Sequence, residues 1–189
     1  MKRIAWFIGS LIGFMLISGS ALAITYTFDE YSVGTIITNQ YSYFTLLSGT
    51  DGNTGRIALD SDFPSAPVLS PSTTSGWTGD YTLDFVVPVY GLSFDTGYWN
   101  TPGAGVIDVF ASDDTTLVAQ LSNVGTVIEA FDLSSYGNIG KLYFSSLSDP
   151  AGSSIDNLSF TPVPEPSTFL LLGGGLAGLA FVVRRRKKE

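Results

Sequence analysis

Tyr81-Thr82-Leu83-Asp84-Phe85-Val86-Val87 is the stretch that indicates the fold of this chain most clearly. Apolar residues at 81, 83, 85 and 87 alternate with Thr82 and Asp84, and successive side chains of a β-strand point to opposite faces. The stretch therefore predicts a strand with one buried face. Pro88 follows, and because proline cannot donate to a sheet ladder, we expect it to end this strand or to place it at a sheet edge.

Similar short segments lie on both sides of this strand, separated by clusters of glycine, asparagine, aspartate and serine that favour turns. The further predicted strands are 24–28, 35–38, 41–47, 56–59, 91–95, 106–111, 116–121, 126–131, 139–145 and 154–160. Segments 60–79 and 97–105 have the composition of long loops. No segment between them shows the 3.6-residue period of a helix. The pattern predicts an all-β domain, an antiparallel two-sheet sandwich and, most simply, a jelly roll.

The predicted domain, residues 24–160, is strongly acidic. Its basic residues are Arg56 and Lys141, against fifteen carboxylates, so its formal charge is −13, whereas that of the whole chain is −8. Such a surface repels nucleic acid, which excludes that class of partner, and attracts divalent cations. The chain has no cysteine, so we expect its stability to come from packing or from bound ions.

The N-terminal segment has the features of a secretory signal peptide. Lys2 and Arg3 precede an apolar run over residues 4–17, and Ala21 and Ala23 place small residues at the two positions that signal peptidase reads. We therefore expect a signal helix within residues 1–23 and cleavage after Ala23. A first transmembrane helix is the alternative.

The C-terminal segment, residues 161–189, has the features of a membrane tail. Residues 169–183 carry no charge, and residues 184–188 are all Arg or Lys. A helix over 169–183 rises about 22 Å, against a hydrocarbon layer of about 30 Å, so we expect a short transmembrane helix. The basic cluster is expected to stay on the cytoplasmic side, with the domain delivered to the other side.

Three parts of this tail occur in a fixed order: Val163-Pro164-Glu165-Pro166-Ser167-Thr168, an apolar segment with a glycine run, and a terminal basic cluster. In this order they resemble the PEP-CTERM sorting signal of Gram-negative bacteria. The resemblance implies export through the inner membrane, transient anchoring, recognition by an exosortase and removal of the tail near Pro164, Glu165 and Pro166. It also implies delivery to the cell surface or to the extracellular polysaccharide matrix.

A second resemblance covers the predicted domain. The segments 28–36, 40–41, 92–95 and 155–160 resemble the β-sandwich cargo that is commonly joined to this tail, a domain similar in outline to carbohydrate-binding jelly rolls. Segment 43–47 departs from that pattern, because it lacks the expected small-residue start. The resemblance implies carbohydrate association for the exported domain.

Asp156 is the acidic residue whose charge most requires a compensating partner. It shares a strand face with Leu158 and Phe160, so we expect it to point inward, and an inward carboxylate must be compensated. Carbohydrate-binding jelly rolls often hold a structural calcium ion where the first and last strands meet, which makes Asp29, Glu30 and Asp156 the candidate ligands. Alternatively, Asp156 accepts backbone hydrogen bonds or caps a turn. The acidic segments 51–53 and 113–114 are more simply turns.

Aromatic residues in or beside the two loops are candidate glycan contacts, namely Trp77, Tyr98 and Trp99. Sugars stack on exposed aromatic rings, but burial is the commoner role of such rings.

Catalysis has little support in the composition. Without histidine and cysteine, histidine-based triads, cysteine nucleophiles and ordinary zinc sites are excluded. Glu30 and Glu129 are the glutamates of the predicted domain, and nothing marks them as an acid–base pair. The sequence therefore predicts a non-enzymatic surface or matrix protein associated with exopolysaccharide. A lectin-like module with a defined glycan is the alternative, and a glycoside-active enzyme is the third interpretation.

Overall fold

The computed structural model describes residues 21–48, 55–60, 63, 67–71, 80–97, 99–146, 153–164, 173–175 and 178. Residues 22–163 form one compact unit. The predicted signal helix lies outside the described residues, as does the predicted transmembrane helix apart from the helical glycines 173–175 and 178. Within the described part of the chain, no helix has the length and apolar character needed to span a bilayer.

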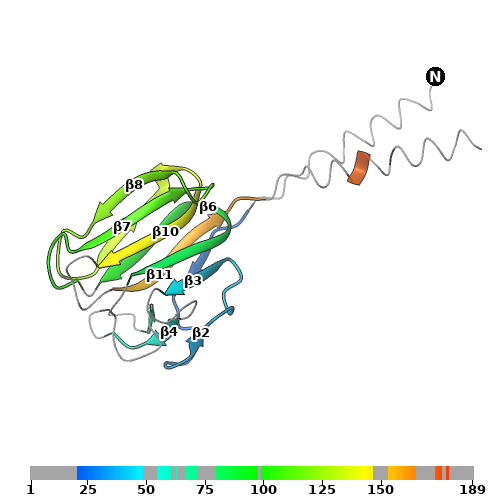
Figure 1. Ribbon diagram of the computed structural model, residues 1–189. Coiled ribbons are helices and arrows are strands. Elements are labelled where there is room, and N and C mark those ends of the chain that lie inside the picture. Colours follow the sequence, from blue (N-terminus) through cyan, green and yellow to red (C-terminus); the bar gives the residue numbers. More distant parts are fainter. Residues whose placement is uncertain are drawn as a thin grey trace, which may run out of the picture. The chain divides into compact units, whose positions relative to one another are not determined.

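The regular elements described in the compact unit are almost all β-strands (Figure 1). The strands are β1 (Ile24–Tyr26), β2 (Ile36–Ile37), β3 (Phe44–Ser48), β4 (Gly55–Ala58), β5 (Val68–Ser70), β6 (Tyr81–Gly97), β7 (Gly105–Ala111), β8 (Leu117–Ser122), β9 (Glu129–Asp132), β10 (Ile139–Ser146) and β11 (Ser154–Pro162). One 3-10 helix, η1, spans Ser134–Tyr136. The described strand pairs are all antiparallel, which confirms the predicted all-β antiparallel fold.

The long strand β6 joins the two layers of this β-sandwich. Its first part, from Tyr81 to Phe85, pairs with β3 and contributes to the pairing with β10, while its last part, from Ser93 to Gly97, pairs with β9 and β11. Between them, Gly91 has φ 61, a left-handed conformation that favours glycine. The strand order is β2-β4-β5-β11-β6-β10-β7-β8, with β1 on β11 and both β3 and β9 on β6. The finer assignment as a jelly roll stays a prediction.

Pro88 neither ends β6 nor places it at an edge, so that expectation is wrong. The partner strand β10 shifts its register between Ile139 and Lys141, which relaxes the ladder beside the proline. The carbonyl oxygen of Pro88 accepts a hydrogen bond from Val163 N at 2.8 Å. The strand continues because its pairing changes where the proline stands.

The predicted loop 60–79 contains a strand that the sequence analysis missed. Val68, Leu69 and Ser70 are buried and form β5, which pairs with β4 and β11. Three residues are too few to establish an alternating pattern among the surrounding prolines and serines.

The core between the layers is rich in aromatic rings. The alternation predicted for β6 is confirmed, since Tyr81, Leu83 and Phe85 are buried. The Tyr81 ring stacks on Phe144 of β10, with 4.4 Å between centroids and 7° between planes. Such pairs add about 0.5–1.5 kcal/mol to the stabilisation from burial alone.

The first and last strands of the unit are neighbours, with Ile24 opposite Phe160 and Tyr26 opposite Leu158. The last strand, β11, pairs with β6 along one edge, and β5 and β1 pair with successive parts of its other edge.

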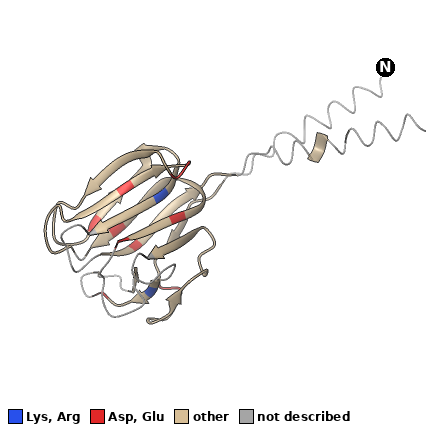
Figure 2. Cartoon of the chain, in the orientation of Figure 1, with Lys and Arg blue, Asp and Glu red and all other residues tan. Residues whose placement is uncertain are grey.

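Carboxylates are spread over the described strands (Figure 2), and the basic residues of the described part of this unit are Arg56 and Lys141.

Candidate functional site

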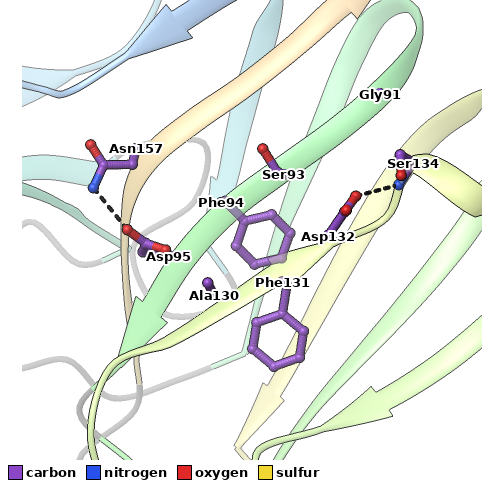
Figure 3. Close-up of a pocket in the computed structure, with 9 residues that line it drawn as sticks. All are labelled: Gly91, Ser93, Phe94, Asp95, Ala130, Phe131, Asp132, Ser134 and Asn157. Atoms are coloured by element: carbon purple, nitrogen blue, oxygen red, sulfur yellow. Dashed lines mark hydrogen bonds between the residues drawn. The ribbon is translucent and has the colours of Figure 1, made fainter.

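An open groove of about 370 Å³ lies over the end of β6 and its neighbours β9 and β11 (Figure 3). It is lined by Gly91, Ser93, Phe94, Asp95, Ala130, Phe131, Asp132, Ser134 and Asn157. Its volume is within the range of small-molecule sites, and its lining mixes hydroxyl, amide and carboxylate groups.

The register of β6 and β9 produces the polar part of this lining. Ser93 lies opposite Asp132, and Asp95 lies opposite Ala130, so these side chains share one face of the strand pair. Phe94 and Phe131 form the pair between them, and their rings stack with centroids 5.6 Å apart. Phe94 is buried in the core. The aromatic pair fixes the two strands, and the alternate face offers short polar side chains.

A bulge in β11 brings Asn157 to the groove. The register of β11 against β6 shifts between Asp156 and Ser159, and Asn157 has φ 50. Asparagine tolerates this left-handed conformation better than most residues. Its amide nitrogen Nδ2 donates a hydrogen bond to Asp95 Oδ2 at 2.8 Å, the contact drawn between these residues in Figure 3. The bulge thus links the groove face of β6 to the last strand.

Asp132 forms the opposite side of the lining. Its Oδ1 atom accepts a hydrogen bond from Ser134 N at 2.9 Å, at the start of η1. This backbone hydrogen bond lowers the pKa of the Asp132 carboxyl below its ordinary value, because it stabilises the charged form. Asp132 is therefore a persistent acceptor at neutral pH, next to the hydroxyl of Ser134.

Asp156 is fully buried, as its position on the strand predicted. Its Oδ1 atom accepts a hydrogen bond from Asn157 N at 2.7 Å, so the carboxylate stabilises the bulge. This contact matches the alternative role, acceptance of a backbone hydrogen bond.

The other two candidate calcium ligands lie at the surface. β1 ends at Tyr26, and Phe28 has φ 59 and is buried, which leaves Asp29 and Glu30 exposed. Glu30 Oε2 accepts a hydrogen bond from the Tyr41 hydroxyl at 3.4 Å. Across the described ranges, no three His, Cys, Asp or Glu side chains are placed to hold a metal ion together. The calcium site stays a prediction without support from this geometry.

Of the candidate glycan contacts, Trp77 and Tyr98 lie outside the described residues. Trp99 is 1% exposed, so its ring offers no free face for a sugar in this structure. The indole Nε1 of Trp99 is buried and has no hydrogen-bond partner among the described residues.

The two glutamates considered for catalysis lie in separate contacts. Glu129 Oε1 accepts hydrogen bonds from Val124 N at 2.7 Å and from Gly125 N, and so closes the turn before β9. Glu30 contacts Tyr41, as described above. Neither glutamate lines the groove.

Comparison with known families identifies the end of the chain. Residues 162–187 match the family model described as the PEP-CTERM protein-sorting motif. The tail is a PEP-CTERM sorting motif. It marks the chain as an exported protein of the bacterial cell envelope or surface, and it implies processing by exosortase-type machinery.

No curated protein matches this chain. A solved family 29 carbohydrate-binding module is 12% identical and has a TM-score of 0.38, over 75% of this chain and 93% of the module. The K2 cleaved adhesin domain of Lys-gingipain is 14% identical with a TM-score of 0.37, over 74% of this chain and 99% of that domain. The K1 cleaved adhesin domain of Lys-gingipain, from Porphyromonas gingivalis, is 10% identical with a TM-score of 0.34, over 75% of this chain and 99% of that domain. Similarity at this level carries no argument about the ligand. The ligand must be inferred from the groove itself.

Proposed function

We propose that this chain is a non-enzymatic cell-surface or matrix protein whose β-sandwich associates with exopolysaccharide. The sorting motif at residues 162–187 carries the proposal. In this scheme signal peptidase removes residues 1–23, and a helix over 169–183 anchors the chain transiently in the inner membrane of a Gram-negative bacterium. An exosortase-type enzyme then cuts near Pro164, Glu165 and Pro166, and the sandwich joins the surface or the matrix.

The chemistry of the groove supports a polyol as the ligand. Sugar hydroxyls both donate and accept hydrogen bonds, and the groove offers acceptors at Asp95 and Asp132 and hydroxyls at Ser93 and Ser134. Asn157 is fixed by its contact with Asp95, so its side chain loses little freedom when a ligand binds. The open groove admits a polymer that continues beyond one sugar ring.

The charge of the domain narrows the class of polysaccharide. A formal charge of −13 over residues 24–160, with two carboxylates in the groove, repels polyanions. We therefore expect neutral polysaccharide to bind directly and acidic polysaccharide to bind only when divalent cations bridge the two. A lectin-like module that selects one defined glycan is the second candidate, favoured by the fixed Asn157–Asp95 contact.

The sorting step is tested by intact mass and cell fractionation in a host with and without its exosortase. We expect the mature domain, without either terminal segment, at the surface or in the medium only when the enzyme is present. An uncut tail in the inner membrane of both hosts would overturn the sorting scheme.

The groove is tested by binding of the processed protein to neutral polysaccharide. Asp132→Asn removes a groove charge but keeps an oxygen that can accept from Ser134 N, and we expect binding to weaken about ten-fold, the value of one lost charged hydrogen bond. Asp113→Asn is the matched control, because Asp113 is also an exposed turn carboxylate that accepts from backbone nitrogens, at 2.8 Å from Thr116 N. Equal effects of the two substitutions would exclude the groove as the binding site.

A further inference from the structure

β8 is an open sheet edge with little protection. It stands at the end of the strand order, and among the described residues its strand partner is β7. Sheet edges are usually protected by charged side chains, by proline, by β-bulges or by very short strands. β8 has six residues, Leu117-Val118-Ala119-Gln120-Leu121-Ser122, without a charge or a proline, and a register shift at its start, beside Val118, is the one such device that it has. The described strands β1, β2, β3 and β9, which also have one partner strand each, are shorter.

The edge also lies in an uncharged stretch of the domain. Residues 115–128 contain no Asp, Glu, Lys or Arg, although the domain as a whole carries a formal charge of −13. Two copies of an acidic protein repel one another over their charged surfaces, so a neutral edge is a place where they can approach. Leu117 and Val118 are 51% and 38% exposed, which leaves apolar surface to be covered there.

The hydrogen-bond pattern defines which backbone groups are free at this edge. Asn123 N donates to Gly105 O at 3.3 Å, and these residues come opposite each other when the β7–β8 register, with Val106 opposite Ser122, is continued by one residue. Because hydrogen-bonded and non-hydrogen-bonded pairs alternate along an antiparallel ladder, the N–H and C=O groups of Gln120 and Ser122 point away from β7. Val118 has no partner on β7 in the described register, which shifts beside it.

We propose that β8 pairs with β8 of a second copy of this chain, antiparallel, about a two-fold axis at Gln120. This register places Gln120 opposite its own counterpart, so the outward-pointing backbone groups of the two copies meet at the axis, and it places Ser122 opposite Val118 at the register shift. A shift of the two-fold axis by one residue along β8 would place the inward-pointing backbone groups of Ala119 or Leu121 at the axis. Because both free edges are used, the result is a closed dimer and not a filament.

The antiparallel arrangement also keeps the acidic groups of the two copies apart. The acidic turn at Asp113 and Asp114 precedes β8, so the two turns lie at opposite ends of the paired strands, further apart than the length of β8 itself, which is about 20 Å at about 3.3 Å per residue. Asp108, which accepts from Gln120 Nε2 at 2.8 Å, is three strand spacings, about 14 Å, from its counterpart. Both separations exceed the Debye length of about 8 Å at physiological salt. A parallel pair would instead bring the acidic turns together.

The association is tested by sedimentation of the processed protein over a range of concentrations. We expect a monomer–dimer equilibrium that Gln120→Lys weakens at least ten-fold, because the substitution places like charges directly opposite each other at the axis. Thr45→Lys is the matched control: it adds the same charge at an exposed position of β3 and is expected to leave the dimer intact. Ser122→Pro provides a second disruption, since it removes an N–H that the folded monomer does not use. A wild-type protein that stays monomeric, or a dimer that tolerates Gln120→Lys and Ser122→Pro, would overturn the proposal.

The absence of cysteine from the sequence allows a direct test of the register. Opposed residues of a hydrogen-bonded antiparallel pair have Cα atoms about 5.5 Å apart, within reach of a disulfide. Gln120→Cys is therefore expected to form a disulfide-linked dimer on mild oxidation. Val124→Cys is the control, because Val124 is 83% exposed and lies beyond the strand. Equally fast linkage at both positions would indicate random collision and contradict the two-fold at Gln120.

Discussion

The ring of Trp99 lies directly against Gly105, in the space that a side chain at Gly105 would occupy. Trp99 is 1% exposed and Gly105 begins β7, so the contact joins the segment after β6 to the next strand. A glycine is required here by close approach and not by backbone conformation.

We expect Gly105→Ala to lower the free energy of unfolding by about 1–3 kcal/mol, because the added methyl group would overlap the ring carbons of Trp99. Urea unfolding measures the change. In the double variant Gly105→Ala/Trp99→Leu the overlap is relieved. The double variant should therefore lose less free energy of unfolding than the sum of the losses of the two single variants. Additive losses would show that the two residues do not compete for space.

Position 157 should tolerate replacement of Asn157 by glycine better than replacement by alanine. Both substitutions remove the hydrogen bond to Asp95, but at φ 50 alanine adds backbone strain that glycine avoids, about 1 kcal/mol. Thermal or urea unfolding should therefore rank Asn157→Gly above Asn157→Ala in stability.

Ser159, two residues further along β11, is the control for this ranking. Both substitutions there remove the hydrogen bond from the Thr25 hydroxyl to Ser159 Oγ, and the backbone is in a strand. The Ser159→Gly variant should be less stable than the Ser159→Ala variant by about 0.5–1 kcal/mol. The same ranking at both positions would contradict a strained bulge.

Tyr143 should make the stability of the domain depend on alkaline pH. Its hydroxyl donates to Asp80 Oδ2 at 2.8 Å, which raises its pKa to about 12, since the carboxylate disfavours a phenolate. In the unfolded chain the phenol ionises near its ordinary pKa of about 10, so this stabilisation is present below that pH. It is lost as the pH rises from about 10 to about 12. Tyr143→Phe should reduce the slope of stability against pH in this window, and an unchanged slope would exclude the contact as its cause.

Asp84→Asn should stabilise the domain slightly at neutral pH. Partial burial raises the pKa of the Asp84 carboxyl, with a further contribution from Asp114, although Lys141 opposes the shift. The ionised form is thus disfavoured in the folded state above the carboxyl pKa, and an amide avoids this cost. We expect the free energy of unfolding to rise by about 0.5 kcal/mol or less at neutral pH. The gain should disappear on acidification, because below a pH of about 4 the Asp84 carboxyl is protonated in both the folded and the unfolded chain. A loss of stability at neutral pH would show that attraction to Lys141 dominates.

The sequence predicts the strands of this domain where the alternation is long. Tyr81, Leu83 and Phe85 are buried as predicted, and Asp156 is buried as its strand position requires. β5 was missed because three residues cannot display a period, and the passage of β6 through Pro88 depends on a shift in a distant partner strand. Local pattern determines the face of a residue, whereas tertiary pairing determines where a strand ends.

The groove was less accessible to prediction. Alternation along β6 could have placed Ser93 and Asp95 on one face, but their partners come from β9 and from a bulge in β11. Asn157 meets Asp95 across 62 positions of sequence, and the left-handed turn that allows this leaves no local signal beyond the asparagine itself. Sites assembled from separate strands need the register, which only the fold provides.

The neighbours of β11 give the domain a mechanical axis. A pull on the chain at Val163 enters the sandwich along β11, which is paired with β1, β5 and β6. Tension directed along a strand loads its cross-strand hydrogen bonds in shear, so several must yield together and not one after another. Asn157 of the groove lies on the same strand, whereas most of the groove lining comes from β6 and β9, so the force between a held C-terminus and a bound polymer would cross the ladder between β6 and β11. Strands β2, β4, β7 and β8 pair with neither β6 nor β11 in the described residues and would remain outside this path.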